Sequence, residues 1–439
     1  MCEKVYIETL GRQMNKSDTE KIVGILESVG YIRTQEAQKA NLLIINTCSI
    51  RAASEDKAFS HLGVWGKWKR SNPELKIAIC GCIAQQSKHK IFKRAPYLDL
   101  IFGTHNIDEL PELISKIKSD QRVCSAPNTP YKSNHNFKIK RENGISAWLP
   151  IIEGCDYFCT YCVVPYTRGR QRSRLPEEII EEAREIANQG YKEITLLGQT
   201  VDSYGRDLED EKISLSNLLK ELNKIQNIHR IRFLTSHPHD MTDELIQTVK
   251  ELDKVCEYFH IPMQSGNTEI LHKMRRKYTR EEYIELINKI RAQIPEVGIT
   301  TDFIAGFPGE TEEQFEDTLS IIEELGFDQC ITAAYSPRLQ TPASTWKNHH
   351  LSREVKKDRL NRLNEKGKEV TKISNDNEIG RIVEVLVEKY SDEDESILYG
   401  RARNNKIIHF QGDISLISTL VHVKITSALN WCLKGELVD

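Results

Sequence analysis

The chain has 439 residues, of which 39% are hydrophobic and 28% are charged, and its formal net charge is −3. This length suits two or three domains, and the near-neutral charge excludes a globally basic nucleic-acid-binding protein, so any such site must be a local basic patch. The eleven cysteines do not fit a small disulfide-rich secreted domain. They are better explained as metal ligands, catalytic groups or core residues in a reducing compartment.

The first residues, MCEKVYIETLG, lack the apolar core of a signal peptide, and no run of the sequence reaches the apolar length that spans a bilayer. We therefore expect a cytoplasmic protein without a membrane segment.

Residues 1–120 alternate between strand and helix patterns. The expected strands are VYIETLG, NLLIINTCS, KIAICGCIAQ and LDLIFGTHN, and SDTEKIVGILESVG is an amphipathic helix with Ser17 or Asp18 as its N-cap. Such alternation predicts a parallel sheet covered by helices, whose ligand groups gather at the carboxyl ends of the strands. Cys48 and Cys82 lie at the carboxyl ends of two of these strands, and the first strand ends at the matching place with Gly11 and Arg12.

Residues 121–145 are rich in Asn, Pro, Ser and Lys and are interpreted as a linker or an edge element. Residues 146–372 then resume the alternation, with about six strand–helix units and a helix that starts at Pro176 and stops at Gly190. This pattern predicts an incomplete (β/α)6 barrel with functional loops after its strands. The unusual motifs do follow expected strands: the cysteine loop, GQTVDSYG, TSHPHD, MQSGN and GFPGET.

Cys155, Cys159 and Cys162 share one short loop with the spacing C-x3-C-x2-C. Three thiolates can hold three irons of a four-iron, four-sulfur cluster and leave the fourth iron open to a small molecule. Zinc is the weaker interpretation, because no cysteine or histidine follows closely as a fourth ligand. Three inert buried cysteines are the remaining alternative, which this spacing in a polar loop disfavours.

Basic residues are concentrated in two further places. Arg168 and Arg170 belong to an alternating arginine run after the cysteine loop, which can hold a carboxylate or nucleic-acid phosphates. A solvated charged edge is the alternative. Residues 373–437 contain short β-type runs that predict a small five-stranded OB-like barrel. Within it, Arg401 and Arg403 near Tyr399 combine basic and aromatic character that suits RNA.

The cysteine loop EGCDYFCTYCVVPYTRGRQRSR resembles the radical S-adenosylmethionine (radical SAM) signature, and nearly the whole chain resembles the methylthiotransferase family. The resemblance implies an N-terminal methylthiotransferase domain, a radical SAM core and a C-terminal TRAM domain. SHPHDMTDELI, FHIPMQSGN and MRRKYTREEY are most similar to members that convert N6-dimethylallyladenosine next to the tRNA anticodon to its 2-methylthio form. Members that modify threonylcarbamoyladenosine or a ribosomal protein are the near alternatives.

The resemblance also implies the cofactors and partners. A four-iron cluster on Cys155, Cys159 and Cys162 and bound S-adenosylmethionine would supply radical chemistry, and a second cluster would supply sulfur. The expected partners are tRNA and an electron donor such as flavodoxin or ferredoxin, and the expected state is a monomer. Candidate cofactor-binding residues, for which strand capping or a tight turn is the alternative role, are Gly198, Gln199, Ser236, Gln264, Gly306 and Gly309.

One departure from the family pattern concerns the second cluster. The family pattern GCQMN is GRQMN here, so Arg12 replaces one of three expected ligands beside Cys48 and Cys82. Arginine stays protonated and offers only hydrogen-bond donors, so it cannot ligate iron. Cys80 is a poor candidate replacement. A SAM-cleaving enzyme without sulfur insertion and a tRNA-binding protein without catalysis are therefore rival hypotheses, although the intact cysteine loop disfavours the latter.

Milder departures lie in the expected barrel. Thr200 and Asp202 stand where the resemblance predicts asparagine, and Leu339–Gln340 stand where Pro–Gly is usual.

Overall fold

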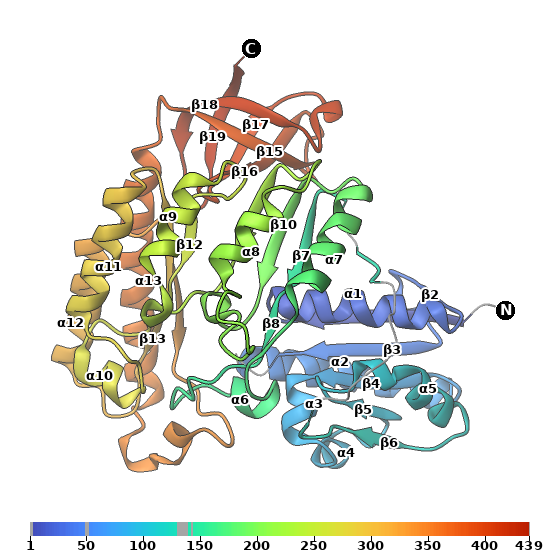
Figure 1. Ribbon diagram of the computed structural model, residues 1–439. Coiled ribbons are helices and arrows are strands. Elements are labelled where there is room, and N and C mark those ends of the chain that lie inside the picture. Colours follow the sequence, from blue (N-terminus) through green and yellow to red (C-terminus); the bar gives the residue numbers. More distant parts are fainter. Residues whose placement is uncertain (1–2, 49–51, 130–138, 142–143, 439) are drawn as a thin grey trace. The chain divides into compact units, whose positions relative to one another are not determined.

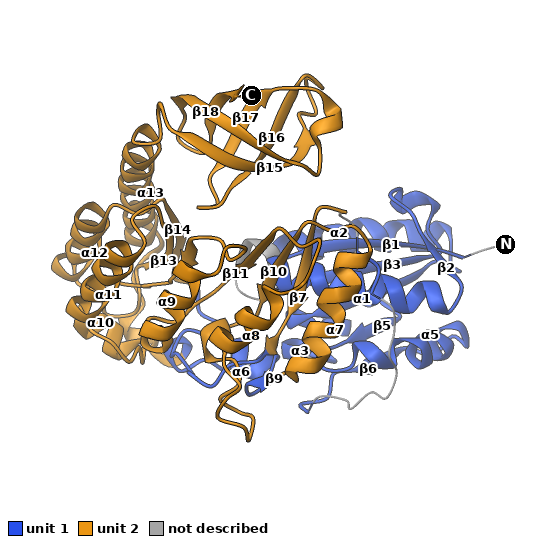
Figure 2. Ribbon diagram, turned by 45° about the horizontal axis from the view of Figure 1, so that its top comes forward, with its two compact units in different colours: residues 1–143, 153–172, 336–344 blue, residues 144–152, 173–335, 345–439 orange. Residues whose placement is uncertain are grey.

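The computed structural model of the protein describes residues 3–48, 52–129, 139–141 and 144–438. The chain forms two compact units, each made of segments from different parts of the sequence (Figure 2). The first unit contains Met1–Asn143, Glu153–Arg172 and Ser336–Ser344, and the second contains Gly144–Ile152, Ser173–Tyr335 and Thr345–Asp439. The loop with three cysteines therefore belongs to the first unit, together with the N-terminal sheet.

The first unit is built on a six-stranded sheet in the order β2-β1-β3-β4-β5-β6, in which all neighbouring strands are parallel. Helices α1 and α5 pack their apolar side chains on one face, and α2, α3 and α4 pack on the other. Figure 1 shows these helices around the sheet. The parallel sheet and its four expected strands are confirmed. The elements are β1 (Glu3–Leu10), α1 (Gln13–Ser28), β2 (Tyr31–Arg33), β3 (Leu42–Thr47), α2 (Ala52–Ser71), β4 (Lys76–Gly81), α3 (Cys82–Ser87), α4 (Lys90–Arg94), β5 (Leu100–Phe102), α5 (Leu110–Lys118), β6 (Val123–Ser125) and, after the cysteine loop, α6 (Val164–Thr167).

The predicted N-cap of the first helix is wrong. Helix α1 begins at Gln13, and the carbonyl of its N-cap Arg12 accepts hydrogen bonds from the amides of Asn15 and Lys16. Ser17 and Asp18 lie inside the helix, where they are 5% and 9% exposed. The reason is that the chain turns directly from β1 into the helix, so the helix starts before the first good capping residues. The segment 121–145 contributes β6 as an edge strand, and its residues 130–138 and 142–143 lie outside the described residues.

The second unit contains the predicted six parallel strands, which form two three-stranded sheets in the orders β11-β10-β7 and β12-β13-β14. A parallel bridge between Ile231 and Val255 links the two sheets. The expected partial barrel is confirmed, and its helices cover one apolar core. The elements are β7 (Ser146–Pro150), β8 (Ile152–Glu153), β9 (Arg172–Ser173), α7 (Pro176–Asn188), β10 (Glu193–Leu197), α8 (Leu215–Leu222), β11 (Arg230–Phe233), α9 (Asp243–Glu251), β12 (Tyr258–His260), α10 (Thr268–Lys273), α11 (Arg280–Gln293), β13 (Gly298–Ala305), α12 (Glu312–Leu325), β14 (Gln329–Ala334) and α13 (Arg353–Asp376).

The last strands close the small barrel that the sequence predicts, in the order β15-β16-β17-β19-β18. These strands are β15 (Ile382–Tyr390), β16 (Ile397–Ala402), β17 (Ile407–Gln411), β18 (Leu420–Ala428) and β19 (Leu433–Val438). Alternating residues such as Val385, Val387 and Leu398 fill its interior, so the intervening residues face outward. Within the described part of the chain, no helix is both long and apolar enough to cross a membrane.

Candidate functional site

The three cysteines of the C-x3-C-x2-C motif lie on one tight loop of the first unit. The amide of Cys162 donates to the carbonyl of Cys159 at 2.9 Å, and the amide of Cys155 donates to the carbonyl of Gly169 at 3.2 Å. Gly154 precedes the loop with φ +77°, and a Cβ atom there would lie 2.1 Å from the carbonyl oxygen of Arg170. The loop is therefore pinned at its base by backbone contacts that only glycine permits.

The donor set of this loop fits a four-iron cluster. Cys159 is 6% exposed, whereas Cys155 and Cys162 are half-buried, so the loop offers its thiols from a partly sheltered position. The described residues contain no preassembled group of three His, Cys, Asp or Glu side chains at metal-binding separation. The spacing of the three cysteines on one short loop is the feature that favours a shared cluster.

A second pair of cysteines lies at the carboxyl edge of the N-terminal sheet. Leu10 of β1 pairs with Thr47 of β3, which pairs with Gly81 of β4. The next residues along these adjacent strands are Gly11, Cys48 and Cys82, and the two cysteines are 4% and 6% exposed. The sheet therefore gathers two buried thiols beside the turn that carries Arg12.

The residues at this edge do not fit a cluster held by three thiolates. Arg12 stands at the N-cap of α1, where its guanidinium is a cation and not an iron ligand. Cys80 lies inside β4 and is 1% exposed in the core that α1 and α5 cover. Burial raises the pKa of the Cys80 thiol well above its usual value, which opposes the thiolate form that iron requires. This placement supports the expectation that Cys80 does not replace the missing ligand.

Arg168 is buried, which argues against the expected RNA contact. Its side chain is 5% exposed, and its Nη2 atom donates to Oδ2 of Asp18 at 2.5 Å. Burial alone would lower the pKa of Arg168, but the neighbouring Asp18 and Cys82 raise it well above the usual value, so the guanidinium stays charged. The pair ties the segment after the cysteine loop to α1 and leaves Arg168 little surface for a phosphate.

Arg170 remains accessible beside the cysteine loop. Its Nε and Nη2 atoms donate to the carboxylate of Asp156 at 2.7 and 3.1 Å, and its guanidinium lies 5.4 Å from the ring centre of Phe158. The side chain is still 71% exposed. An exposed arginine stacked near an aromatic ring suits a nucleic-acid contact.

Four of the expected cofactor-binding residues follow barrel strands β10, β11 and β12. A Cβ atom at Gly198 would lie 2.2 Å from Cγ2 of Ile152, so glycine is needed for close packing there. Oε1 of Gln199 and Oγ of Ser236 are buried and have no hydrogen-bond partner among the described residues. Gln264 has φ +77°, and its amide donates to the carbonyl of Asp302 at 2.8 Å. Gln199 and Ser236 are thus the stronger ligand candidates.

Gly306 and Gly309 follow β13 in a tight turn. Both have positive φ, at +72° and +76°. The amide of Gly306 donates to Oε2 of Glu310, and that of Gly309 donates to the carbonyl of His349. Since both amides already bind protein oxygens, these contacts favour the turn role over contact with a ligand.

A pair of carboxyl groups that was not expected from the sequence lies at the ends of β10 and β11. Asp202 follows β10, and its Oδ2 atom accepts from the amide of His237 at 2.7 Å. Asp240 follows β11, is 1% exposed, and accepts from Nη1 of Arg206 at 2.5 Å. An available signal was the presence of an acidic residue in both motifs after consecutive parallel strands.

The C-terminal barrel carries a basic and aromatic row across four strands. Lys389 of β15 pairs with Tyr399 of β16, Tyr399 with His409 of β17, and His409 with Lys434 of β19. The rings of Tyr399 and His409 stack at 5.5 Å, and Nζ of Lys389 lies 5.1 Å from the Tyr399 ring centre. Burial, followed by the charge of Lys434, holds the pKa of His409 below its usual value, so the ring is neutral.

Arg401 and Arg403 both have protein partners. Arg401 is 37% exposed and pairs with Glu388 at 2.8 Å, so it keeps some contact with solvent beside the row. Arg403 pairs with both carboxylate oxygens of Glu257 and donates to the carbonyls of Asp253 and Val255. Its guanidinium therefore joins the small barrel to the larger barrel of the same unit, which argues against the expected RNA contact.

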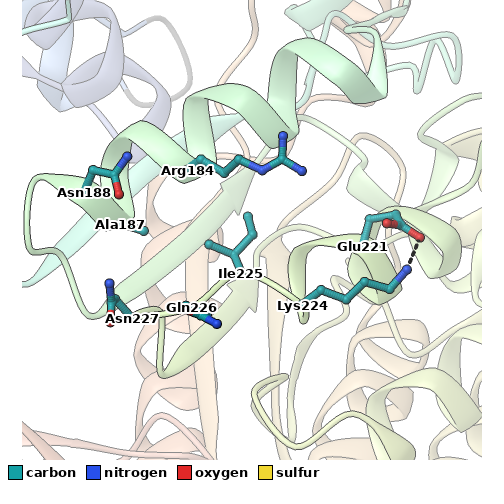
Figure 3. Close-up of a pocket in the computed structure, with 8 residues that line it drawn as sticks. All are labelled: Arg184, Ala187, Asn188, Glu221, Lys224, Ile225, Gln226 and Asn227. Carbon is teal, nitrogen blue, oxygen red and sulfur yellow. Dashed lines mark hydrogen bonds and ion pairs between the residues drawn. The ribbon is translucent and has the colours of Figure 1, made fainter.

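A surface cavity of about 320 Å³ lies between the end of α7 and the segment after α8 (Figure 3). Helix α7 ends shortly before β10 begins, so this cavity lies toward the amino-terminal side of that strand. Functional groups in parallel barrels gather at the opposite ends of the strands. The cavity therefore lies apart from the candidate site. Its lining residues are Arg184, Ala187, Asn188, Glu221, Lys224, Ile225, Gln226 and Asn227.

Comparison with known proteins decides the family. Residues 149–322 match the radical SAM superfamily, residues 4–103 match the uncharacterized protein family UPF0004, and residues 376–438 match the TRAM domain. The tRNA-2-methylthio-N(6)-dimethylallyladenosine synthase of Geobacillus kaustophilus is 49% identical over 439 residues, which cover 99% of this chain and 82% of the relative. The synthase of Clostridium perfringens is 46% identical and covers 100% of this chain and 99% of the relative. This chain belongs to the radical SAM methylthiotransferase family.

Solved structures agree with the fold of this methylthiotransferase. The radical S-adenosylmethionine methyltransferase TsrM from Kitasatospora setae, with cobalamin and a [4Fe-4S] cluster bound, has a TM-score of 0.56 at 15% identity and covers 78% of this chain and 77% of that chain. The cobalamin-dependent radical enzyme OxsB has a TM-score of 0.52 at 14% identity and covers 81% and 56% of the two chains. Family membership implies one [4Fe-4S] cluster and S-adenosylmethionine as cofactors.

Proposed function

We propose that this methylthiotransferase converts N6-dimethylallyladenosine next to the anticodon of tRNA to its 2-methylthio derivative. The supporting observation is full-length similarity, at 46–49% identity, to relatives named for that reaction, together with the intact cysteine loop. A cluster bound at Cys155, Cys159 and Cys162 would supply the radical that attacks an unactivated C–H bond. The residues of this chain would hold the nucleoside and S-adenosylmethionine beside it and exclude water.

We propose that tRNA is held by exposed basic and aromatic side chains. The row of Lys389, Tyr399, His409 and Lys434 combines two cations with two stacked rings, which suits phosphates and unpaired bases. Arg170 and the half-exposed Arg401 are the remaining arginine candidates of those expected from the sequence. We also propose that the enzyme works as a monomer in the cytoplasm, with electrons from a donor such as flavodoxin or ferredoxin.

The N-terminal site limits this function in the present sequence. Cys48 and Cys82 offer two buried thiols, and Arg12 occupies the position of the third ligand. We therefore propose that any second cluster is incomplete, and that sulfur insertion is weaker than S-adenosylmethionine cleavage. A homologue that cleaves S-adenosylmethionine without sulfur insertion is the second candidate function, and Arg12 is the observation that favours it.

The test is nucleoside mass spectrometry on protein reconstituted anaerobically with iron and sulfide and then reduced. The two substrates are tRNA carrying N6-dimethylallyladenosine and a matched tRNA carrying threonylcarbamoyladenosine. We expect 5′-deoxyadenosine in every reaction and 2-methylthio product, if any, only from the first tRNA. Methylthiolation of the second tRNA alone would refute the proposed substrate, and deoxyadenosine without product would support the second candidate.

The control replaces Cys155, Cys159 and Cys162 by alanine. The thiolates are the expected cluster ligands, so the triple variant should lose 5′-deoxyadenosine formation. Undiminished formation in this variant would contradict the assignment of the radical cluster.

A further inference from the structure

Two carboxyl groups meet where the loops after β10 and β11 are tied together. Asp202 lies in the 3-10 turn Val201–Ser203, and Asp240 ends the 3-10 turn Pro238–Asp240. The amide of Val201 donates to the carbonyl of Thr235 at 3.0 Å, and the amide of His237 donates to Oδ2 of Asp202 at 2.7 Å. Nη1 of Arg206, in the loop after β10, donates a hydrogen bond to Oδ1 of Asp240 in the loop after β11. The loops are therefore fixed at the carboxyl ends of the barrel strands.

The environment makes one of the two carboxyl groups neutral. Asp240 pairs with Arg206, and Nδ1 of His239 lies 3.1 Å from its Oδ1 atom. Burial, and next the charge of Asp240, raises the pKa of Asp202 well above its usual range, while Arg206 opposes this shift. Burial therefore favours the protonated form of Asp202.

Histidine does not reverse this assignment. Burial, followed by the charge of Arg276, lowers the pKa of His237, and His239, Arg206 and Lys277 act in the same direction. His237 is therefore neutral and offers no cation to Asp202. The groups that act on Asp202 are Asp240 and the backbone of His237 from the β11 loop and Arg206 from the β10 loop. His239 from the β11 loop, and Arg276 and Lys277 from the segment after α10, act on the neighbouring His237.

Several buried polar atoms at this edge have no hydrogen-bond partner among the described residues. Among them are Oδ1 of Asp202, Oε1 of Gln199 and Oγ of Ser236. Ser236 is 3% exposed and directly precedes His237, whose amide binds Asp202. A buried polar group without a partner costs roughly 1–3 kcal/mol. The unpartnered atoms of Gln199, Asp202 and Ser236 on two adjacent loops indicate a site for a polar ligand.

We propose that Asp202 is the neutral acid of this pair and that its Oδ1–H group donates a hydrogen bond to a ring nitrogen of a bound adenine. Oδ2 already accepts from the main chain of His237, so the proton belongs on Oδ1. The unalkylated ring nitrogens of adenine are acceptors, and an ionised carboxylate also only accepts, so the neutral acid alone can make this bond. It offers the same donor and acceptor as asparagine, the residue that the family resemblance predicts at this position.

The inference rests on the proposed function, in which both S-adenosylmethionine and the target nucleoside carry an adenine. Asp202 is assigned as a positioning residue for one of these two adenines. The binding experiment has one arm for each source: S-adenosylmethionine alone, and an anticodon stem-loop RNA carrying N6-dimethylallyladenosine. Both are measured at equilibrium between pH 6 and pH 9 on the iron-loaded protein without a reductant, so that turnover does not contribute.

Asp202→Asn is the reference variant, because its amide donates at every pH. We expect the wild-type protein to lose affinity for one ligand as pH rises, by up to about tenfold per pH unit once Asp202 ionises, relative to Asp202→Asn. Asp240→Asn removes a neighbouring negative charge, so Asp202 should ionise more easily. The pH at which half of the affinity is lost should therefore be lower in this variant than in the wild-type protein. The matched control Asp210→Asn changes an exposed aspartate nearby on the β10 loop and should follow the wild type.

The ligand that responds identifies the adenine. Identical pH profiles of wild-type protein and Asp202→Asn for both ligands would overturn the proposal, and so would full affinity in Asp202→Ala. The proposed function is tested separately by product formation. A pH-dependent difference in binding without methylthio product would therefore leave the assignment of Asp202 intact and contradict only the reaction.

Discussion

At the residue scale, Arg12 is the difference between the two cysteine-containing sites of this enzyme. The cysteine loop keeps its three thiols, whereas the strand-end site has Cys48 and Cys82 beside a cation. Cys80 is held in the core of the sheet, on the strand that leads to Cys82. Under the proposed function, the side chain at position 12 decides whether a third ligand is available beside Cys48 and Cys82, whereas the three cysteines of the loop do not depend on it.

We predict that Arg12→Cys restores the second cluster. Iron content should rise from roughly four atoms toward roughly eight per protein, and 2-methylthio product should appear or increase strongly. Formation of 5′-deoxyadenosine should barely change, because its cluster uses other ligands. The control Glu27→Cys adds a thiol at the far end of α1 and should leave the iron content unchanged. A wild-type protein that already binds two complete clusters would contradict this prediction.

The buried side chain of His105 should make the free energy of unfolding of the first unit depend on pH. It is 8% exposed, and burial, followed by the charge of Arg172, lowers its pKa to about 4. The unfolded chain therefore binds a proton below about pH 6.5 that the folded chain does not, so stability falls as the pH drops from about 6.5 to 4. The expected loss is about 2 kcal/mol between pH 7 and pH 5.

Urea unfolding at pH 7 and pH 5 measures this loss. His105→Gln should remove most of the difference between the two pH values, whereas His89→Gln, at an exposed position, should keep it. An equal acid loss in the wild type and His105→Gln would show that other groups are responsible.

At the element scale, strand register builds the surface that we assign to tRNA. Lys389, Tyr399, His409 and Lys434 come from four strands, and the ladder pairing places them side by side. Neighbouring positions of these strands fill the barrel core, for example Leu398 and Ile408. The alternation of a closed barrel therefore directs the row outward.

We predict that Tyr399→Ala weakens tRNA binding by roughly 1–3 kcal/mol, since it removes a stacking ring. Lys389→Ala should reduce the slope of the logarithm of the binding constant against the logarithm of the salt concentration by about 1, since one phosphate contact is lost. The matched control is Tyr390→Ala, which removes an exposed tyrosine of β15 outside the row. Filter binding at several salt concentrations measures both effects, and an equal loss in the Tyr390 variant would refute the row as the contact surface.

At the scale of the whole molecule, the small barrel is structurally joined to the larger one within the second unit. Arg230 is 0% exposed, and its guanidinium donates to the carbonyl of Glu384, whereas Arg232 donates to the carbonyls of Ala402 and Arg403. In the opposite direction, Arg403 of the small barrel forms an ion pair with Glu257, which directly precedes β12 of the larger barrel. Backbone carbonyl groups of the TRAM barrel therefore accept hydrogen bonds from the buried arginines of β11.

Deletion of residues 377–439 should consequently destabilise the radical SAM barrel. The deletion removes the oxygens of Glu384 and Arg401 that bind the Arg230 guanidinium, so the remaining chain should unfold at a clearly lower urea concentration. Arg403→Ala should have a smaller effect in the same direction. If the shortened protein unfolds at the same urea concentration as the full chain, the joint between the barrels contributes no stability.

Much of this architecture can be predicted from the sequence, because strand and helix periods are local. The six barrel strands and the closed C-terminal barrel follow from such patterns, and the cysteine loop is recognisable by spacing alone. The start of α1 and the edge strand β6 were less predictable, since a direct strand–helix turn and a three-residue strand carry weak local signals. Residue type alone also could not separate Arg170, which is exposed, from Arg168, which is buried.

The sequence by itself determined the family, the presence of the C-x3-C-x2-C loop and the replacement at Arg12, because each depends on residue identity and spacing. The tertiary structure decided which charged groups have partners. Asp18 meets Arg168 across 150 residues, Arg403 meets Glu257 across 146, and Asp202 lies in a turn tied to that of Asp240. Such pairs arise from strand order and packing, which bring distant segments together. Burial then shifts the pKa values of the paired groups, which depend on the tertiary structure for that reason.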